Sequence, residues 1–174
     1  MWASDEHRLG LKPVRRRVWA PIGARPLALG HHRYEWLYLT AFVEPTSGET
    51  VWYLSNGVSK PFFEKLLAAF ARITGAGRTR RIVLVLDNAG WHGAAGLAVP
   101  EGIRLVYLPP YTPELQPAER LWPLVDEPIV NTHFATLADL DEALARRCCT
   151  LHDDPPRIAK HASFHWWPKP VIVN

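Results

Sequence analysis

The five residues from Ile82 to Leu86 are all aliphatic, and the run ends at a carboxylate, Asp87. An unbroken apolar run of this length between turn signals is typical of a strand that is buried on both faces, as in the centre of a parallel sheet. Such a strand needs helices packed on both sides of the sheet. The sequence therefore predicts an α/β domain built around residues 82–86.

The chain before this run predicts a hairpin and a helix. Aromatic and β-branched residues at 36–43 and 51–54, separated by a turn cluster at 44–49, indicate a β-hairpin with a long loop. A helix is expected from its cap at Ser59 to about Thr74, because apolar residues recur three and four positions apart. These residues are Phe63, Leu66, Leu67, Phe70 and Ile73.

The chain after the run predicts one more strand and two more helices. Residues 103–108 form a short β-rich segment, and Gln116 opens a helix with proline at its first turn that stops at Pro128. Thr136 and Asp139 resemble a capping box at the start of the last helix, which continues through Cys148. Residues 152–174 show no period and are interpreted as an irregular tail. The expected fold is a single α/β domain over residues 1–174, with a mixed central sheet flanked by helices.

Composition excludes several classes of protein. The chain has 174 residues, 48% of them hydrophobic, which is an ordinary globular composition. No apolar run approaches the ~20 residues that a membrane span needs, and no secretory signal opens the chain. The two cysteines, Cys148 and Cys149, are adjacent, which argues against a disulfide-built secreted fold. We expect a cytoplasmic protein without a membrane partner, whose net charge of +3 permits binding to nucleic acid.

Three carboxylates lie where a catalytic site could form. Asp5 follows the apolar residues 1–4, which indicate a strand cut short at its start, and Asp87 ends the buried strand. Glu119 lies in the first turn of the helix that opens at Gln116. Sites in α/β sheets form at the carboxyl ends of strands, and converging carboxylates require a counter-charge. Mg²⁺ suits such a site, and two ions ~3.5–4 Å apart would support phosphoryl transfer.

Each carboxylate also has an ordinary structural explanation. An aspartate at a strand end commonly caps a helix or forms a turn, and a glutamate near a helix start compensates the helix dipole. Glu6 and Glu114 are the nearest rivals for the site. Glu6 should point to the side of its strand opposite to Asp5, and Glu114 lies in the loop before Pro117.

Two longer motifs surround these carboxylates. The strings LDNAGWH at 86–92 and LPPYTPELQPAERLW at 108–122 closely resemble DDE transposases of bacterial insertion sequences, in the mariner-like branch of the IS-six-thirty family. Residues 5–13 and 16–21 look like the first catalytic segment of that family, and residues 131–151 and 164–168 resemble its closing elements. The resemblance extends over nearly the whole chain.

The resemblance implies an RNase H-like fold and assigns Asp5, Asp87 and Glu119 as the catalytic, metal-binding triad. It also implies two Mg²⁺ ions, with Mn²⁺ as an alternative, and a homo-oligomer that acts on transposon ends and target DNA. One departure is Gln116, where the family usually has asparagine, a better helix cap.

A second departure concerns DNA recognition. Family members carry an N-terminal helix-turn-helix region, and none precedes Asp5 here. The chain therefore resembles a catalytic domain whose helix-turn-helix partner is encoded upstream, or a decayed remnant. Because few residues precede Asp5, we expect the Asp5 end of the site to be the least firmly held.

Several further residues are candidates for DNA contacts. His92 could orient a phosphate or a metal-bound water, and Asn88 could bond a phosphate. Both could make structural hydrogen bonds instead. Two basic groups could follow DNA phosphates or carry only solvated loop charge: Arg15, Arg16 and Arg17, and Arg78, Arg80 and Arg81. The pair His31–His32 lacks further ligands at a suitable spacing for a metal site.

The sequence as a whole favours a nucleoid-associated transposase catalytic domain that cleaves DNA and transfers the cut strand. Two alternatives remain open at this point. One is an inactive remnant that binds DNA without specificity or dimerises, and the other is an RNase H-like nuclease without strand transfer.

Overall fold

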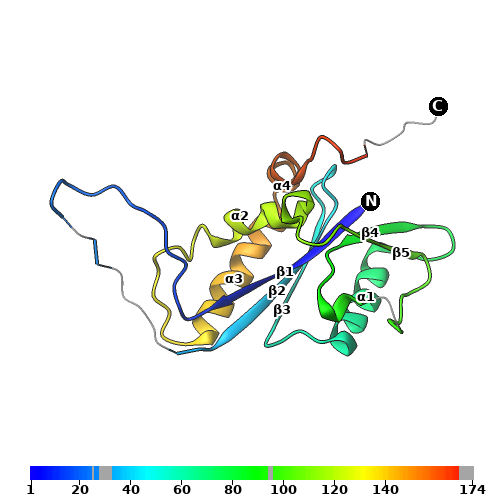
Figure 1. The fold of residues 1–174 in the computed structure, drawn as a ribbon, viewed down its shortest axis with the longest axis horizontal. Helices are drawn as coiled ribbons and strands as arrows, with labels where there is room; N and C mark the ends of the chain where they lie inside the picture. The colour runs from blue at the N-terminus through cyan, green and yellow to red at the C-terminus, as the bar shows by residue number, and fades with distance from the viewer. Residues whose placement is uncertain (25, 28–32, 94–95, 169–174) are drawn as a thin grey trace.

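A five-stranded mixed sheet forms the centre of the protein in a computed structural model, which describes residues 1–24, 26–27, 33–93 and 96–168 (Figure 1). The strands are β1 (Trp2–Gly10), β2 (Trp36–Val43), β3 (Thr50–Ser55), β4 (Ile82–Leu86) and β5 (Ile103–Tyr107). Their order across the sheet is β3-β2-β1-β4-β5. The pairs β1–β2 and β2–β3 are antiparallel, whereas β1–β4 and β4–β5 are parallel. The predicted hairpin and the predicted central strand are both confirmed.

Strand β1 is longer than the sequence predicted. It has nine residues, so Asp5 lies within the strand rather than at its end. The ladder to β2 runs from Ala3 to Gly10 and continues past the polar residues Glu6 and His7. Those two side chains find partners on neighbouring elements, so they do not stop the strand. The expectation of a short first strand is therefore wrong, and Asp5 is only 7% exposed. That the Asp5 end of the site is the least firmly held stays a prediction.

Helix α1 (Lys60–Thr74) covers one face of the sheet. Ser59 caps it by accepting a hydrogen bond from the Phe62 amide, and Gly75 ends it with a φ of 68°. Its apolar face packs with Trp2, Phe42 and alternate residues of β4. The predicted helix is confirmed, but Ile73 is 62% exposed because it lies at the edge of that face.

Four segments cover the opposite face of the sheet, on which α1 does not lie (Figure 1). The helix predicted at Gln116 begins as a 3-10 turn, η3 (Pro117–Leu121), and continues as α2 (Trp122–Asp126). Helix α3 (Leu137–His152) opens with the predicted capping box, and α4 (Pro155–Ala162) follows it. Two shorter 3-10 turns, η1 (Gly90–His92) and η2 (Pro113–Leu115), complete the structure.

The interpretation of residues 152–174 as an irregular tail is wrong for its first part. Helix α4 lies within it, with Asp154 accepting from the Arg157 amide and proline in the first turn. Ile158 and Ala162 are fully buried in the core on this side of the sheet, where α4 contacts η3 and α3. Gly48 in the β2–β3 loop lies so close to α4 that a Cβ there would collide with the Pro155 carbonyl. Residues 169–174 of the tail, like the pair His31–His32, lie outside the described residues.

Residues 15–24, which follow β1, extend away from the sheet (Figure 1). Residues 15–24 are exposed, and Trp19 and Ile22 have no cover. The start of this segment is fixed by Asn131, whose side chain exchanges two hydrogen bonds with the backbone of Arg16. No helix in the described part of the chain is both long and apolar enough to cross a bilayer.

Candidate functional site

The register between β1 and β4 brings Asp5 level with Asp87. The two strands pair at Trp2–Leu84 and Ala3–Val85, and two further residues along each strand lead to the two aspartates. Side chains two positions apart share a face of a strand, so both carboxylates continue the face of Ala3 and Val85. The ladder stops at Ala3–Val85, so Asp5 and Asp87 lie just beyond it.

A cavity of about 380 Å³ opens at this point. It is lined by Asp5 from β1, Asp87 from the end of β4 and Glu119 from η3. Asn88, Gln116 and the loop at 108–113 form the rest of its wall. The structure therefore brings the three carboxylates that the sequence singled out to one cavity, from three separate segments.

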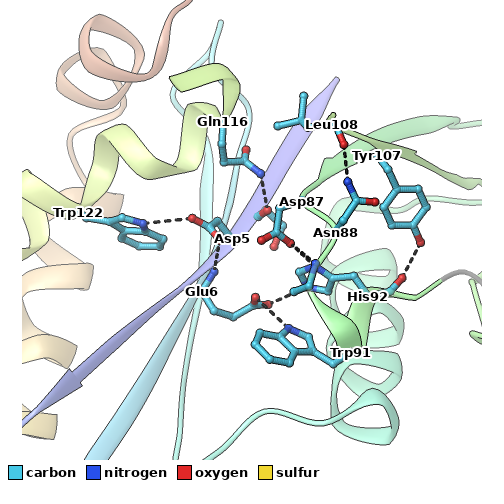
Figure 2. A network of polar contacts seen from close by, with 12 residues as sticks. Asp5, Glu6, Asp87, Asn88, Trp91, His92, Tyr107, Leu108, Gln116 and Trp122 are labelled. Carbon is cyan, nitrogen blue, oxygen red and sulfur yellow. Dashed lines mark hydrogen bonds and ion pairs between the residues drawn. The ribbon is translucent and has the colours of Figure 1, made fainter. Parts of the chain in front are cut away.

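Asp5 is the buried member of the three. Its Oδ1 accepts from the Glu6 amide at 2.8 Å, and its Oδ2 accepts from the Trp122 indole at 3.2 Å (Figure 2). Burial, and then the negative charges of Glu119 and Glu6, raise the pKa of Asp5 to about 8. Asp5 is therefore largely protonated at neutral pH unless a cation binds nearby.

Asp87 is held in its charged form. Its Oδ1 accepts hydrogen bonds from His92 Nδ1 at 2.7 Å and from the Ala89 amide at 3.0 Å. The hydrogen bond from His92 lowers the pKa of Asp87. The cavity thus has one charged and one protonated aspartate, with the exposed Glu119 facing them.

His92 is fully buried, and both of its ring nitrogens face carboxylates (Figure 2). Nδ1 contacts Asp87, and Nε2 lies 3.1 Å from Glu6 Oε1. Burial alone would lower the pKa of His92, but the hydrogen bonds to Asp87 and Glu6 outweigh burial and raise it to about 9. Of the two roles left open for His92, this structure shows the structural hydrogen bonds, since the imidazole is buried and both nitrogens contact carboxylates. A contact of His92 with DNA stays a prediction.

Glu6 supports the site, a role that was not predicted from the sequence. It points away from Asp5, as alternation predicted: Asp5 contacts Trp122, whereas Glu6 contacts His92 and Trp91. The signal was present in the sequence, because an ionisable side chain inside a sheet strand must find a partner.

Gln116 joins η3 to the strand that carries Asp5. It caps no helix with its side chain, and its amide instead donates to the Ser4 carbonyl at 3.0 Å. Gln116 is 2% exposed, so this hydrogen bond is shielded from water. The Gln116 side chain therefore links η3 to β1.

We expect Gln116→Ala to lower the free energy of unfolding by about 1–3 kcal/mol, because the Ser4 carbonyl would lose its buried donor. Urea denaturation measures this loss. Thr112→Ala is the control, because the Thr112 hydroxyl bonds an exposed carbonyl, that of Pro109. An equal loss in both variants would contradict a specific role for the Gln116 amide.

The remaining candidates are spread over the molecule. Asn88 lines the cavity, and its side-chain amide donates to the Leu108 carbonyl. Glu114 is exposed on η2 and does not line the cavity. Arg78, Arg80 and Arg81 precede β4 and so lie at the end of that strand opposite to Asp87, where Arg78 contacts Glu101 at 3.3 Å.

Arg15, Arg16 and Arg17 form the exposed basic segment after β1. The Arg16 guanidinium donates to the Pro123 carbonyl in α2. The neighbouring residue in that helix is Trp122, which bonds Asp5. This segment is therefore connected to the site through α2, whereas the Arg78 group is not.

The carboxylates fit a hard divalent cation by their chemistry. Three carboxylates and the amide oxygen of Asn88 offer the oxygen ligands that Mg²⁺ prefers. Burial, and then the negative charges of Glu119 and Glu6, raise the pKa of Asp5, and a bound cation would oppose both effects. Among the described residues, no three His, Cys, Asp or Glu side chains are yet arranged as a metal site. Binding would therefore require Asp5 to lose its proton and the side chains to close on the ion.

The sequence profile of the DDE superfamily endonucleases matches residues 1–142, and the chain belongs to this family. It is also 31% identical over 135 residues to the uncharacterised protein y4pE/y4sA of Sinorhizobium fredii (strain NBRC 101917 / NGR234). That match covers 75% of this chain and 96% of the relative.

Solved structures of Mos1 share the fold. A pre-cleavage Mos1 transpososome matches 95% of this chain with a TM-score of 0.59 at 14% identity, and a Mos1 strand transfer complex matches 95% with 0.58 at 14%. The chain spans 56% and 55% of the respective Mos1 chains, about half their length. The predicted RNase H-like fold is thereby confirmed.

Proposed function

We propose that residues 1–174 are the catalytic domain of a DDE transposase that cleaves DNA at transposon ends and transfers the cut strand. The main support for this proposal is that Asp5, Asp87 and Glu119 line one cavity in a member of an endonuclease family. The shared fold of the Mos1 complexes supports it. The motifs at 86–92 and 108–122 support the mariner-like bacterial branch of the IS-six-thirty family.

The proposed cofactor is Mg²⁺, with Mn²⁺ as a substitute and two ions per site. Mos1 paired-end complexes with Mn and with Mg are among the structures that share the fold. When bound, such ions activate water and stabilise the leaving oxygen. Asp5, Asp87 and Glu119 would hold them. Asp87 is already charged and oriented by His92, whereas Asp5 must first release its proton.

Plasmid nicking tests the proposal directly. The chain should nick supercoiled DNA when Mg²⁺ or Mn²⁺ is present and stop when the metal is chelated. Joined products from a cut end and a target duplex distinguish a transposase from a nuclease without strand transfer. A folded chain that shows no metal-dependent cleavage would contradict the proposal and favour an inactive remnant.

DNA is the proposed partner, bound chiefly through phosphates. The net charge of +3 and the exposed arginines at 15–17 fit weak, sequence-independent binding with a clear salt dependence. Because the domain spans about half of the Mos1 chains, we propose that recognition of a transposon end needs a helix-turn-helix region outside residues 1–174. We also propose a homo-oligomer in the active complex and association with the nucleoid.

We expect the two basic groups to differ in their contribution to DNA binding. Replacing Arg15, Arg16 and Arg17 by glutamine should weaken binding and reduce the slope of log K against log salt by up to about 3, because each phosphate contact contributes about 0.9. The same change at Arg78, Arg80 and Arg81 should have a smaller effect, since these residues lie at the far end of β4. Fluorescence anisotropy over a salt series measures both. Equal slopes for both variants and the wild type would identify the arginines as solvated loop charge.

A further inference from the structure

A single imidazole bridges β1 and the end of β4 where their ladder stops. His92 lies 3.1 Å from Glu6 Oε1 on β1 and 2.7 Å from Asp87 Oδ1 after β4 (Figure 2). The backbone hydrogen bonds between these strands end at Ala3–Val85. Beyond that pair, the side chains of Glu6, His92 and Asp87 connect β1 to the end of β4. The bridge therefore connects Asp87 to β1 beyond the end of the ladder.

Further contacts enclose the bridge. The imidazole is 0% exposed, and the Phe63 ring packs against it with centroids 4.4 Å apart. The Tyr107 hydroxyl donates to the His92 carbonyl at 2.6 Å, and the Trp91 indole donates to Glu6 Oε2 at 3.1 Å. Neither Glu6 nor His92 can rotate without breaking one of these contacts.

Glu6 and Asp87 occupy different positions with respect to the cavity. Asp87 lines the cavity, whereas Glu6 does not and points to the α1 side of the sheet. The hydrogen bonds from His92 and from the Ala89 amide both fall on Asp87 Oδ1. Oδ2 is therefore the oxygen of Asp87 that remains for a cation.

We propose that Glu6 is a positioning residue, which orients His92 so that His92 fixes Asp87 with one oxygen presented to the metal. This inference rests on the proposed function, because it concerns the same metal site. Glu6 itself would touch neither metal nor DNA. Groups that orient a metal ligand typically change metal affinity about 10–100-fold when they are removed.

A double-mutant cycle on Mn²⁺ affinity tests the inference without relying on cleavage. Glu6→Gln is combined with His92→Asn, which keeps an amide donor near the place of Nδ1 but does not reach Glu6. Electron paramagnetic resonance counts free Mn²⁺ during a titration of each folded variant. Glu114→Gln is the matched control, because it removes an equal charge from an exposed position outside the cavity.

We expect Glu6→Gln to weaken Mn²⁺ binding about tenfold and His92→Asn to weaken it by a similar factor. The double variant should bind Mn²⁺ about as tightly as whichever single variant binds it less tightly. Glu114→Gln should bind Mn²⁺ with the affinity of the wild type. Non-additivity is expected because both changes interrupt one chain of contacts. If Glu6→Gln does not fold, Trp91→Phe replaces it, since this change removes only the indole bond to Glu6 Oε2, and a loss of a few-fold is expected.

Three results would overturn the inference. Additive losses in the double variant would mean that Glu6 acts on the metal directly. Unchanged Mn²⁺ affinity in a folded Glu6→Gln variant, with a lowered melting temperature, would mean that Glu6 serves the fold alone. A wild-type chain that binds no Mn²⁺ would overturn the proposed function itself, and this inference with it.

Discussion

Replacing Asp87 by asparagine is expected to lower metal-dependent DNA cleavage by about a thousandfold or more, which is roughly 4 kcal/mol of lost transition-state stabilisation. Asp87 is the carboxylate that His92 keeps charged, and it lines the cavity shared with Asp5 and Glu119. Asparagine has the same size, and its oxygen can still accept from His92 and from the Ala89 amide. The fold should therefore survive the change.

Cleavage rates measured over a range of Mg²⁺ concentrations check this expectation, together with a thermal melt of the same sample. Glu114→Gln provides the control, because it removes a negative charge from the same region at an exposed position on η2. If Asp87→Asn cleaves DNA within a few-fold of the wild type, Asp87 does not bind the catalytic metal.

The second large effect concerns Asp5 and pH in the absence of metal. The folded protein holds the proton of Asp5 up to a pKa of about 8, whereas the unfolded chain releases it near 3.8. The stability that comes from the protonated Asp5 is fully present below pH 3.8, the pKa in the unfolded chain. It falls as the pH rises from there and is lost once the pH passes the folded-state pKa of about 8. The difference sets an upper bound of about 6 kcal/mol on the stability lost between those limits.

Asp5→Asn should remove this loss, because asparagine cannot ionise. The asparagine NH₂ group would face another donor, the N–H of Trp122 or of Glu6, and this contact would lower the stability. Because none of these groups titrates, the loss is the same at every pH. Near pH 4 the free energy of unfolding of the variant should therefore be lower than that of the wild type. The difference should change steadily in favour of the variant toward pH 9. His92, whose pKa is about 9, titrates in both proteins, so its effect largely cancels in the comparison.

Urea denaturation at several pH values, with and without Mg²⁺, measures this difference. Mg²⁺ at pH 9 should stabilise the wild type, because binding replaces the repulsion with a counter-charge. It should stabilise Asp5→Asn much less. Parallel pH profiles for the two proteins would contradict a buried, protonated Asp5.

The sequence predicted those elements whose signals are local. The aliphatic run at 82–86 specified the central strand, and the capping box at Thr136 specified the start of α3. Both signals depend on neighbours within a few residues. The end of β1 could not be predicted in this way, because Glu6 and His7 are tolerated in the strand only through His92 and Asp126, which lie 86 and 119 residues away.

The same distinction applies to the site. Strand ends and helix starts made Asp5, Asp87 and Glu119 candidates. The motifs at 86–92 and 108–122, which contain Asp87 and Glu119, then favoured them over the ordinary structural explanations. The buried bridge from Glu6 through His92 to Asp87 depends on the packing of η1 against α1, including the contact of His92 with Phe63. Helix α4 was missed for a similar reason. It has only eight residues, and its packing against η3 and α3 specifies it more strongly than its period does.

Crystals of the chain grown at about pH 8.5 and soaked in Mn²⁺ would test the central claim most directly. The anomalous signal of manganese locates each ion without reference to activity. We expect peaks within the cavity, bound by oxygens of Asp5, Asp87 and Glu119, with Glu6 and His92 still paired behind Asp87. An empty cavity at saturating Mn²⁺, or manganese bound only elsewhere on the surface, would contradict the assignment of these three carboxylates as the metal site.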